Sequence, residues 1–384
     1  MSSEQRVQIP GSQRVAPSHP RIGEADSGKT IEVTVYLRPS GSLDWVDKAG
    51  DASANDRRTI SREELASEYG ASQEDVDKVR KFAAQYGLDV AETDPARRSV
   101  VLRGTVQDVT RAFGAENVGL YEHPKEGRFR GRQGPLTVPS DLGGVITGVF
   151  GVDERPQARP QLRKHPQPHQ ATSYTPPQVA QAYNFPTGVN GSGETVAIIE
   201  LGGGFTQSEL GTYFSGLGVN PPPVIAVGVD GGNNSPGTDQ NADGEVMLDI
   251  EVVGSVAPGA QIVVYFATNT DQGFIDSIST AVHDTTHKPS VISISWGGPE
   301  DSWTQQARTQ MEQAFTEAAA VGVTVTAASG DNGSTDGVTD GKQHVDFPAS
   351  APHALGCGGT SLQIDNGQIS DESVWNDGAG GGAG

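Results

Sequence analysis

The sequence has few cysteines, few aromatic residues and no long apolar run, and each shortage excludes a class of protein. Its single cysteine, Cys357, cannot form an internal disulfide or an all-cysteine metal cage. No apolar stretch approaches the roughly 18 residues of a membrane span, and Met1–Pro20 lacks the apolar core of a signal peptide. Aromatic residues make up only 6% of the chain, which disfavours a carbohydrate-binding surface.

Basic residues are almost missing from the second part of the chain. Residues 1–170 contain 24 basic and 24 acidic residues, whereas residues 171–384 contain 3 basic and 24 acidic ones. The net charge of −21 disfavours nucleic acids and anionic membranes as partners. The bias is consistent with simple solubility. It also predicts acid tolerance, because few cations remain to repel one another in the second part once its carboxylates are protonated.

The length of 384 residues predicts two or three domains, and the composition places the boundary. Residues 153–171 contain four prolines and no apolar periodicity, so we predict an exposed, cleavable linker. Before it we predict a polar tail over residues 1–28 and a small α+β domain over residues 29–152, where strand-like and helical patterns are mixed. A second domain is expected over residues 172–384.

The second domain alternates between apolar, β-branched runs and helical patterns. Such near-continuous apolar strands predict a parallel sheet with helices on both faces, in an α/β fold. Functional sites on such sheets lie at the carboxyl ends of the strands. The expected strands are 195–201, 224–229, 261–267, 291–296 and 323–328, and the expected helices are 206–217, 244–256, 273–283 and 302–321.

Several acidic residues are candidates for proton transfer. Glu245 and Asp249 lie four residues apart on a predicted helix, so both carboxyl groups share one face and can share a proton. A solvated acidic face is the alternative. Glu200 ends the first expected strand, where it can be catalytic or can cap the next helix. Asp331 follows the strand at 323–328, where an ordinary turn residue is the alternative.

Four other patterns suggest sites that we do not adopt. The stretch from Asp239 to Gly244 copies the start of an EF-hand loop but lacks the acid at its twelfth position. His283 and His287 have metal-ligand spacing, but we expect an exposed helix end. Cys357 is expected to be a small buried hydrophobe. Gly359-Thr360-Ser361 is similar to a nucleophile motif, but no helical pattern follows Ser361.

The motifs taken together resemble the precursors of sedolisin-type serine-carboxyl peptidases, in particular the kumamolisin branch. The resemblance covers most of residues 172–378 and implies a subtilisin-like parallel sheet, preceded by a ferredoxin-like propeptide that inhibits the enzyme and is removed by autocleavage. The matching segments, in family order, are TPPQVAQAYNFP (175–186), VAIIELGGGF (196–205), DGEVMLDIEVVGSVAPGA (243–260), ISWGGPEDSW (294–303), AASGDNGSTDG (327–337), VDFPAS (345–350), CGGTSL (357–362) and VWNDG (374–378).

The resemblance implies a catalytic role for three acids and a supporting role for two further residues. Glu245 matches the family's general base, and Asp249 matches the acid hydrogen-bonded behind it. Asp331 matches the acid of the oxyanion hole. Glu200 and Trp296 match outer members of the same network.

The resemblance also implies a substrate cleft. Ser295, Gly297 and Gly298 match the segment that lines the cleft and pairs with the substrate backbone. Asp346 matches an acid near a substrate subsite. The implied partners are therefore peptide and protein substrates and the chain's own propeptide, and the implied state is an extracellular monomer.

One departure concerns the nucleophile. The family serine belongs to a Gly-Thr-Ser motif with a proline four residues after the serine, beyond the VWNDG stretch. Ser361 is followed by LQID instead, so we do not assign it as the nucleophile. The family's Ca²⁺ ligands are likewise expected beyond residue 384. We therefore expect these residues alone to be inactive, and a truncated, non-catalytic peptide-binding polypeptide is the alternative.

The chemistry of these groups requires acid. Histidine is protonated at pH 4 and cannot accept a proton, whereas a carboxylate still can. The carboxyl group of Asp331 can donate a hydrogen bond to an oxyanion only while it is protonated. The sequence therefore predicts an acid-active endopeptidase that works through an acyl-enzyme.

Overall fold

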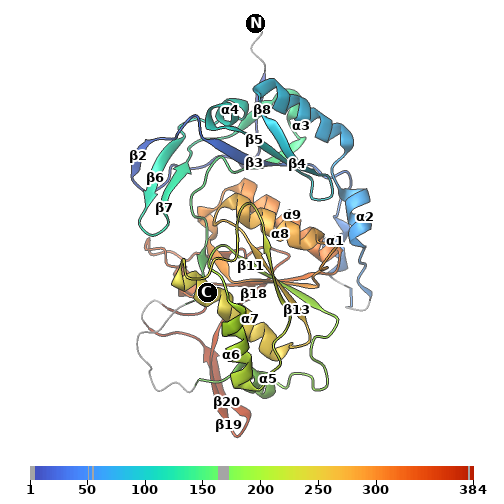
Figure 1. The fold of residues 1–384 in the computed structure, drawn as a ribbon, viewed down its shortest axis with the longest axis vertical. Helices are drawn as coiled ribbons and strands as arrows, with labels where there is room; N and C mark the ends of the chain where they lie inside the picture. Colours follow the sequence, from blue (N-terminus) through green and yellow to red (C-terminus); the bar gives the residue numbers. More distant parts are fainter. Residues whose placement is uncertain (1–4, 51, 54–55, 163–172, 379–380) are drawn as a thin grey trace. The chain divides into compact units, whose positions relative to one another are not determined.

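The computed structural model describes residues 5–50, 52–53, 56–162, 173–378 and 381–384. The contacts between residues divide the chain into two units, and each unit contains its own main sheet (Figure 1). The first unit comprises Met1–Gln157, Asn269–Thr285 and Trp303–Gly322, and the second comprises Ala158–Thr268, Thr286–Ser302 and Val323–Gly384.

The main sheet of the first unit has four antiparallel strands in the order β4-β5-β3-β9. The chain order is strand, helix, strand, strand, helix, strand, so the arrangement is ferredoxin-like, as predicted. The elements are β3 (Thr30–Leu37), α3 (Gln73–Tyr86), β4 (Asp89–Asp94), β5 (Ser99–Thr105), α4 (Val106–Ala112) and β9 (Ile146–Phe150).

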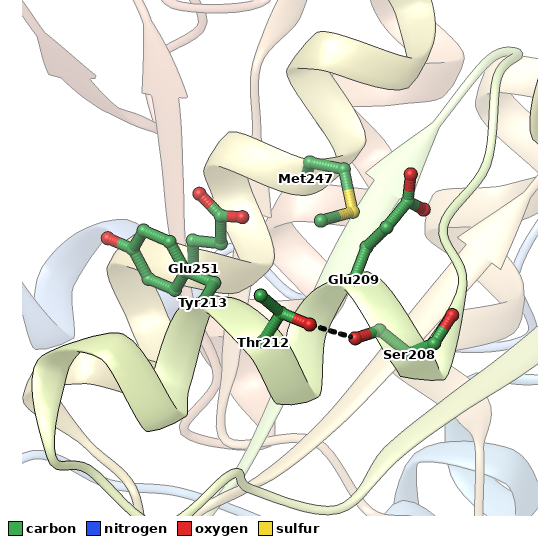
Figure 2. A pocket seen from close by; sticks show the side chains of 6 residues that line it. All are labelled: Ser208, Glu209, Thr212, Tyr213, Met247 and Glu251. Atoms are coloured by element: carbon green, nitrogen blue, oxygen red, sulfur yellow. Dashed lines mark hydrogen bonds between the residues drawn. The ribbon is translucent and has the colours of Figure 1, made fainter.

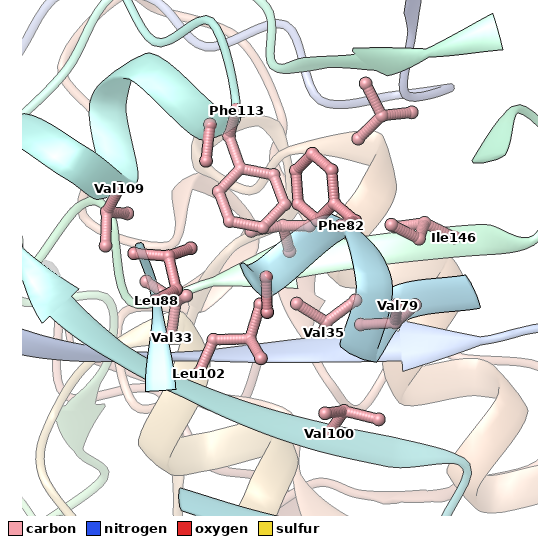
Figure 3. Packing of buried hydrophobic residues seen from close by; sticks show 14 of the residues in the cluster. Val33, Val35, Val79, Phe82, Leu88, Val100, Leu102, Val109, Phe113 and Ile146 are labelled. Atoms are coloured by element: carbon pink, nitrogen blue, oxygen red, sulfur yellow. The ribbon is translucent and has the colours of Figure 1, made fainter. Parts of the chain in front are cut away.

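One apolar core joins this sheet to its two helices (Figure 3). Val33 and Val35 project from β3 to the same side because side chains alternate along a strand. They pack with Phe82 of α3 and with Phe113, which follows α4. The hydroxyl of Ser72 accepts a hydrogen bond from the Asp75 amide at 3.1 Å and so caps α3, as its sequence predicts.

Smaller elements of the first unit surround this core. A two-stranded sheet joins β1 and β8, and a three-stranded sheet has the order β2-β6-β7. The elements are β1 (Arg6–Gln8), β2 (Arg21–Glu24), α1 (Trp45–Ala49), α2 (Arg62–Glu64) with a π-helical turn (Leu65–Tyr69), β6 (Gly119–His123), β7 (Gly127–Gly131) and β8 (Thr137–Pro139).

Helices α8 (Asp271–His283) and α9 (Gln305–Ala320) belong to the first unit, although the sequence analysis places them in 172–384. Buried ion pairs and hydrogen bonds connect them to the N-terminal part. The guanidinium of Arg98 binds Glu317 Oε1 through Nε at 2.9 Å and through Nη2 at 2.6 Å. His283 Nε2 lies 3.1 Å from Glu317 Oε2. The expectation of an exposed His283 is therefore wrong, because a carboxylate on the next helix partners the ring.

Two aspartates of α8 make similar contacts. Asp276 accepts hydrogen bonds from the hydroxyls of Thr34, at 2.6 Å, and Tyr36, both on β3. Asp271 forms a buried ion pair with Arg14. The N-terminal part therefore binds the two helices through the guanidinium groups of Arg14 and Arg98 and through two hydroxyls on β3.

A six-stranded parallel sheet forms the centre of the second unit, in the order β12-β13-β11-β14-β16-β18. This confirms the predicted α/β fold. Helices α6 and α7 contact each other and share an apolar core with the sheet. The strands are β11 (Thr195–Glu200), β12 (Val224–Gly228), β13 (Gln261–Phe266), β14 (Val291–Ile294), β16 (Thr324–Ala328) and β18 (Leu355–Cys357), and the helices are α5 (Pro176–Ala182), α6 (Gln207–Leu217) and α7 (Gln240–Val256).

Two small sheets complete the second unit. One has the order β10-β15-β17, formed by β10 (Arg159–Pro160), β15 (Trp296–Pro299) and β17 (Asp346–Phe347). The other is a hairpin of β19 (Thr360–Asp365) and β20 (Gln368–Val374). Within the described ranges, no helix is long and apolar enough to cross a membrane.

The predicted exposed linker, 153–171, is partly wrong. Its first residues are ordered: Asp153, Gln157 and Gln161 are buried, and β10 pairs with β15. An extended, proline-containing segment can add to a strand edge as readily as it can remain solvated, so composition alone could not distinguish the two. The rest of the predicted linker lies outside the described residues.

The Arg98–Glu317 pair should stabilise the first unit in a pH-dependent way. Glu317→Gln leaves a buried guanidinium unpaired, which should cost about 3–5 kcal/mol at pH 7. Burial alone would raise the pKa of Glu317, but Arg98 and His283 lower it overall. The stabilisation is therefore present above the pKa of the unfolded chain and is lost as pH falls through the lowered native pKa.

Urea unfolding of the two proteins at pH 7 and in acid measures this effect. The matched control is Glu74→Gln, because that side chain is 80% exposed and pairs with Lys78 at the surface. Equal losses of unfolding free energy for the two variants at pH 7 would contradict the assignment.

Candidate active site

Three neighbouring strands of the parallel sheet place functional residues at their carboxyl ends. Glu200 is the last residue of β11, Ser295 follows β14, and Asp331 follows β16 by three residues. Because β11, β14 and β16 are adjacent and parallel, these ends meet at one edge of the sheet. The topology therefore gathers residues that are 131 positions apart in sequence.

Helix α7 brings Glu245 and Asp249 to this edge. The carboxylate of Asp239 accepts hydrogen bonds from the amides of Asn241 and Ala242, so the helix starts before the predicted position at 244. The side chain of Glu245 is buried, with 2% of the residue exposed, whereas Leu248 on the same helix is 40% exposed. The alternative of a solvated acidic face is therefore excluded for Glu245.

Two donors hold the inner acids. The indole Nε1 of Trp296 donates to Glu200 Oε2 at 2.8 Å, and Ser295 Oγ lies 2.9 and 2.8 Å from the two carboxylate oxygens of Asp249. Glu200 Oε1 and Glu245 Oε2 are buried without a hydrogen-bond partner in the described structure. Buried carboxyl oxygens without donors favour protonated groups.

Burial and mutual repulsion raise the pKa values of these acids. Burial, with the nearby charges of Asp249 and Asp331, raises the pKa of Glu245 to about 9. Burial raises the pKa of Asp249 to about 6, against the lowering effect of Ser295. Burial also raises the pKa of Glu200, helped by Asp249. The acids therefore retain protons that isolated carboxyl groups would lose, and they titrate as a group.

Asp331 lies close enough to Glu245 to raise its pKa through charge. The chain reaches Asp331 through Gly330, whose φ of +93° is rarely adopted by residues with a side chain. A Cβ at Gly330 would also lie 3.3 Å from Asp346 Oδ2 and 3.4 Å from Asp336 Oδ1. The glycine therefore lets the loop carry Asp331 past two other acids.

Strand β15 forms one wall of this region. It pairs with β10 on one edge and with β17 on the other, where Gly298 faces Phe347. A Cβ at Gly297 would lie 2.1 Å from Asp346 Oδ1, so only glycine fits there. Asp346 is buried, and its pKa is raised to about 8 by burial and by the charge of Asp336.

Known protein families and known proteins match most of this chain. The family model of the pro-kumamolisin activation domain matches residues 18–155, and the subtilase family model matches residues 226–377. The chain is 47% identical to kumamolisin from Bacillus sp. (strain MN-32), over 99% of this chain and 71% of that protein.

This chain belongs to the sedolisin-type, kumamolisin-like serine-carboxyl peptidase family.

More distant members of the sedolisin family agree with this assignment. The chain is 27% identical to sedolisin from Pseudomonas sp. (strain 101), over 92% of this chain and 64% of that protein. The solved structure of Pseudomonas sedolisin, a serine-carboxyl proteinase complexed with pseudo-iodotyrostatin, matches with a TM-score of 0.50 at 29% identity. That match covers 56% of this chain and 62% of the other. This solved relative is a serine-carboxyl proteinase, and this chain also carries a match to the pro-kumamolisin activation domain.

The Asp239 stretch, Cys357 and Ser361 contribute no residue to the group of Glu200, Glu245 and Asp249. Residues 240–256 form one helix, so the stretch from Asp239 is a cap and not a calcium loop. Cys357 is exposed, which corrects the expectation of a buried residue, because β18 is an edge strand of the described sheet. Ser361 lies in β19, opposite Ser373 of β20. Among the described residues, no group of three or more acidic, His or Cys side chains could hold a metal ion.

A surface groove lies between α6 and α7 of the second unit (Figure 2). Its volume is about 390 Å³, and Thr212 Oγ1 within it donates to the Ser208 carbonyl at 2.9 Å. None of the acids at the sheet edge lines it. The lining residues are Ser208, Glu209, Thr212, Tyr213, Met247 and Glu251.

Sequence reasoning missed three residues that contact this region. Arg159 and Gln161 lie next to β15, and Asp336 forms an ion pair with Arg159. The Asp336-Gly337 dipeptide is an ordinary turn signal, and nothing in its sequence marks a buried acid. The role predicted for Ser295, lining the substrate cleft, was also incomplete, because its hydroxyl hydrogen-bonds to Asp249.

The buried acids should make this sedolisin-family protein less stable as pH rises. Native Glu245 has a raised pKa, so the folded state holds a proton that the unfolded state releases above about pH 4.5. Stability is therefore complete below that pH and falls by about 1.4 kcal/mol per pH unit toward the native pKa.

Glu245→Gln removes this titration. We expect the variant to gain stability relative to the wild type between pH 5 and 7, as measured by urea unfolding at each pH. Asp371→Asn, an exposed substitution on β20, serves as the control. Parallel pH profiles for the wild type and Glu245→Gln would contradict the raised pKa.

Proposed function

We propose that this chain carries the propeptide and most of the catalytic residues of an acid-active serine-carboxyl endopeptidase. The observation that supports the proposal best is the group of buried Glu200 and Glu245 and half-buried Asp249 at the carboxyl edge of the parallel sheet, with Asp331 close enough to affect Glu245. The family membership makes peptide hydrolysis the chemistry that such a group would serve.

In this mechanism a serine hydroxyl attacks the peptide carbonyl. Glu245 accepts the hydroxyl proton, and Asp249 orients Glu245 and shares protons with it. The protonated carboxyl group of Asp331 donates a hydrogen bond to the oxyanion of the tetrahedral intermediate. The amine leaves with a proton from Glu245, and water then hydrolyses the acyl-enzyme by the same steps.

The high pKa of Glu245 is compatible with a base that works in acid. Two of its causes are the negative charges of Asp249 and Asp331. In acid these neighbours become neutral and their part of the shift disappears, whereas the larger part that burial causes remains. A single ionised carboxyl group is sufficient for one proton transfer.

Neither the nucleophilic serine nor the Ca²⁺ of the family mechanism is assigned to a residue of the described site. Ser295 already binds Asp249, and Ser361 lies in the β19–β20 hairpin. In this proposal neither of them is the attacking serine, which the family pattern places after the VWNDG stretch. The Ca²⁺ expected from the family finds no ligand group of three among the described residues, so no step is derived through it. Secretion is expected from the family alone.

Replacement of Glu245 tests the proposed base. In the full-length gene product at pH 3–4, Glu245→Ala should lower kcat for peptide hydrolysis by at least about 100-fold, because proton transfer from the serine loses its acceptor. Cleavage of a quenched fluorescent peptide measures the rate.

Asp371→Asn is the control and should remain within about twofold of the wild type. Activity of Glu245→Ala within a few-fold of the wild type would overturn the assignment. A wild type that binds the peptide without cleaving it would instead support the non-catalytic alternative.

The propeptide should act as an acid-released inhibitor. Arg14 and Arg98 pair with Asp271 and Glu317 of the two helices. Protonation of Glu317 removes its pairing with Arg98, and the N-terminal part keeps its cations while the remainder carries few. Low pH should therefore weaken binding of the propeptide.

The measurement is the inhibition constant of the isolated 1–170 segment against the acid-processed enzyme. We expect weaker inhibition at pH 3 than at pH 6, by about 10-fold or more. Arg98→Gln in the segment should reduce the difference between the two pH values. Equal inhibition at both would show that charge does not control release.

A further inference from the structure

The loop that carries Asp331 has little apolar anchorage. It joins β16 to β17 over residues 331–345, and in this fully described segment no apolar side chain is buried. The segment also contains three glycines, which add to the entropy that the chain loses when the loop becomes ordered. Polar contacts must therefore hold Asp331 at its place beside the acid group.

His344 connects this loop to the chain that leaves β15. Its Nδ1 lies 2.8 Å from Asp301 Oδ2, in the 3₁₀ turn after β15, and its Nε2 lies 2.9 Å from Asp340 Oδ1. The imidazole side chain is only 8% exposed, although both carboxyl groups reach solvent. The backbone amide of His344 donates to the Ser334 carbonyl at 2.9 Å. One residue therefore ties both halves of the loop to the turn after β15.

These two contacts favour a protonated ring, because only the imidazolium has two N–H donors. Hydrogen bonds to Asp340 and Asp301 raise the pKa of His344, which in turn lowers the pKa of Asp340. Lys342, 3.8 Å from Asp340, and Asp336 also act on this group through charge. The bridge is therefore complete between about pH 4 and 6.5. It is lost as pH falls through the lowered pKa of Asp340 or rises through the raised pKa of His344.

The bridge reaches Asp331 through a short, ordered stretch of backbone. Ser334, which accepts from the His344 amide, lies in the 3₁₀ turn Gly333–Thr335, and this turn begins two residues after Asp331. A shift of the loop at the bridge would therefore move the carboxyl group of Asp331. In an active site, a misplacement of about 1 Å can lower the rate by about 100-fold.

We propose that His344 is a positioning residue for Asp331, because its imidazolium holds the loop so that the carboxyl group of Asp331 reaches the oxyanion. The inference rests on the proposed function, which gives Asp331 its role in peptide hydrolysis. It adds a histidine that transfers no proton and acts while it is charged. Such a role suits a ring that is already protonated in acid.

Hydrolysis of a quenched fluorescent peptide by the full-length enzyme at pH 4 tests this role. His344→Gln removes the charge and leaves one donor nitrogen in place of two. We expect kcat to fall by about tenfold or more while KM stays within about twofold, because the positioned group acts in the transition state. Gln343→Ala, an exposed neighbour on the same loop, is the matched control and should stay within about twofold of the wild type.

A double-mutant cycle separates positioning from a general loss of stability. In an Asp331→Ala background, His344→Gln should lower kcat by less than about twofold, because the group that it positions is already absent. Losses that multiply, or a rise in KM with kcat unchanged, overturn this inference and leave the proposed function intact. If Asp331→Ala alone keeps the wild-type kcat, or the wild type cleaves no peptide, the proposed function fails instead.

Amide hydrogen exchange at pH 5 tests the bridge without catalysis. Residues 331–345 of the full-length protein should exchange at least about fivefold faster in His344→Gln than in the wild type or Gln343→Ala, whereas β16 should keep its rate. Asp301→Asn, which changes only the partner in the turn after β15, should act in the same direction. Equal exchange of the loop in all four proteins would contradict the bridge.

Discussion

The repulsion between carboxyl groups in a buried site governs the chemistry of this protein. Glu200 and Glu245 are withdrawn from water, Asp249 is half-buried beside them, and Asp331 acts on Glu245 from the neighbouring loop. Trp296 and Ser295 compensate only part of this cost through hydrogen bonds. Protonation of the carboxyl groups offsets the remaining cost, so the charge of the site depends on the pH of the medium. An imidazole would impose the opposite dependence.

The parallel sheet makes this crowding possible. Three adjacent strands end at the same edge, and each contributes a residue from a distant part of the sequence. Helix α7 adds two acids one turn apart, held by a capped start. Glycines then allow close approach where side chains would clash, at Gly297 against Asp346 and at Gly330 beside the same acid. The rigid backbone thus holds these carboxyl groups close together despite the repulsion between them.

The sequence predicted the parallel sheet and most of the acids at its edge, because strong periodicity and strand ends are local signals. Apolar runs marked β11, β13 and β16, and the four-residue spacing placed Glu245 and Asp249 on one face. The contacts of Arg159 and Asp336 could not be read, because they join segments 177 residues apart. The burial of His283 was missed for the same reason, since its partner lies on another helix. Pairings between distant segments have no local signature.

The occupied edge of β15 has a consequence for how an intact precursor would meet other peptides. Residues 159–161 are tethered to the strand that they cover, so their effective concentration there is of millimolar order and does not change on dilution. A free peptide must compete with that local occupant. Once the tether is cut, the same segment becomes an ordinary solute and can diffuse away. A single backbone cleavage would thus convert a permanent competitor into a dilutable one, with no change in the contacts themselves.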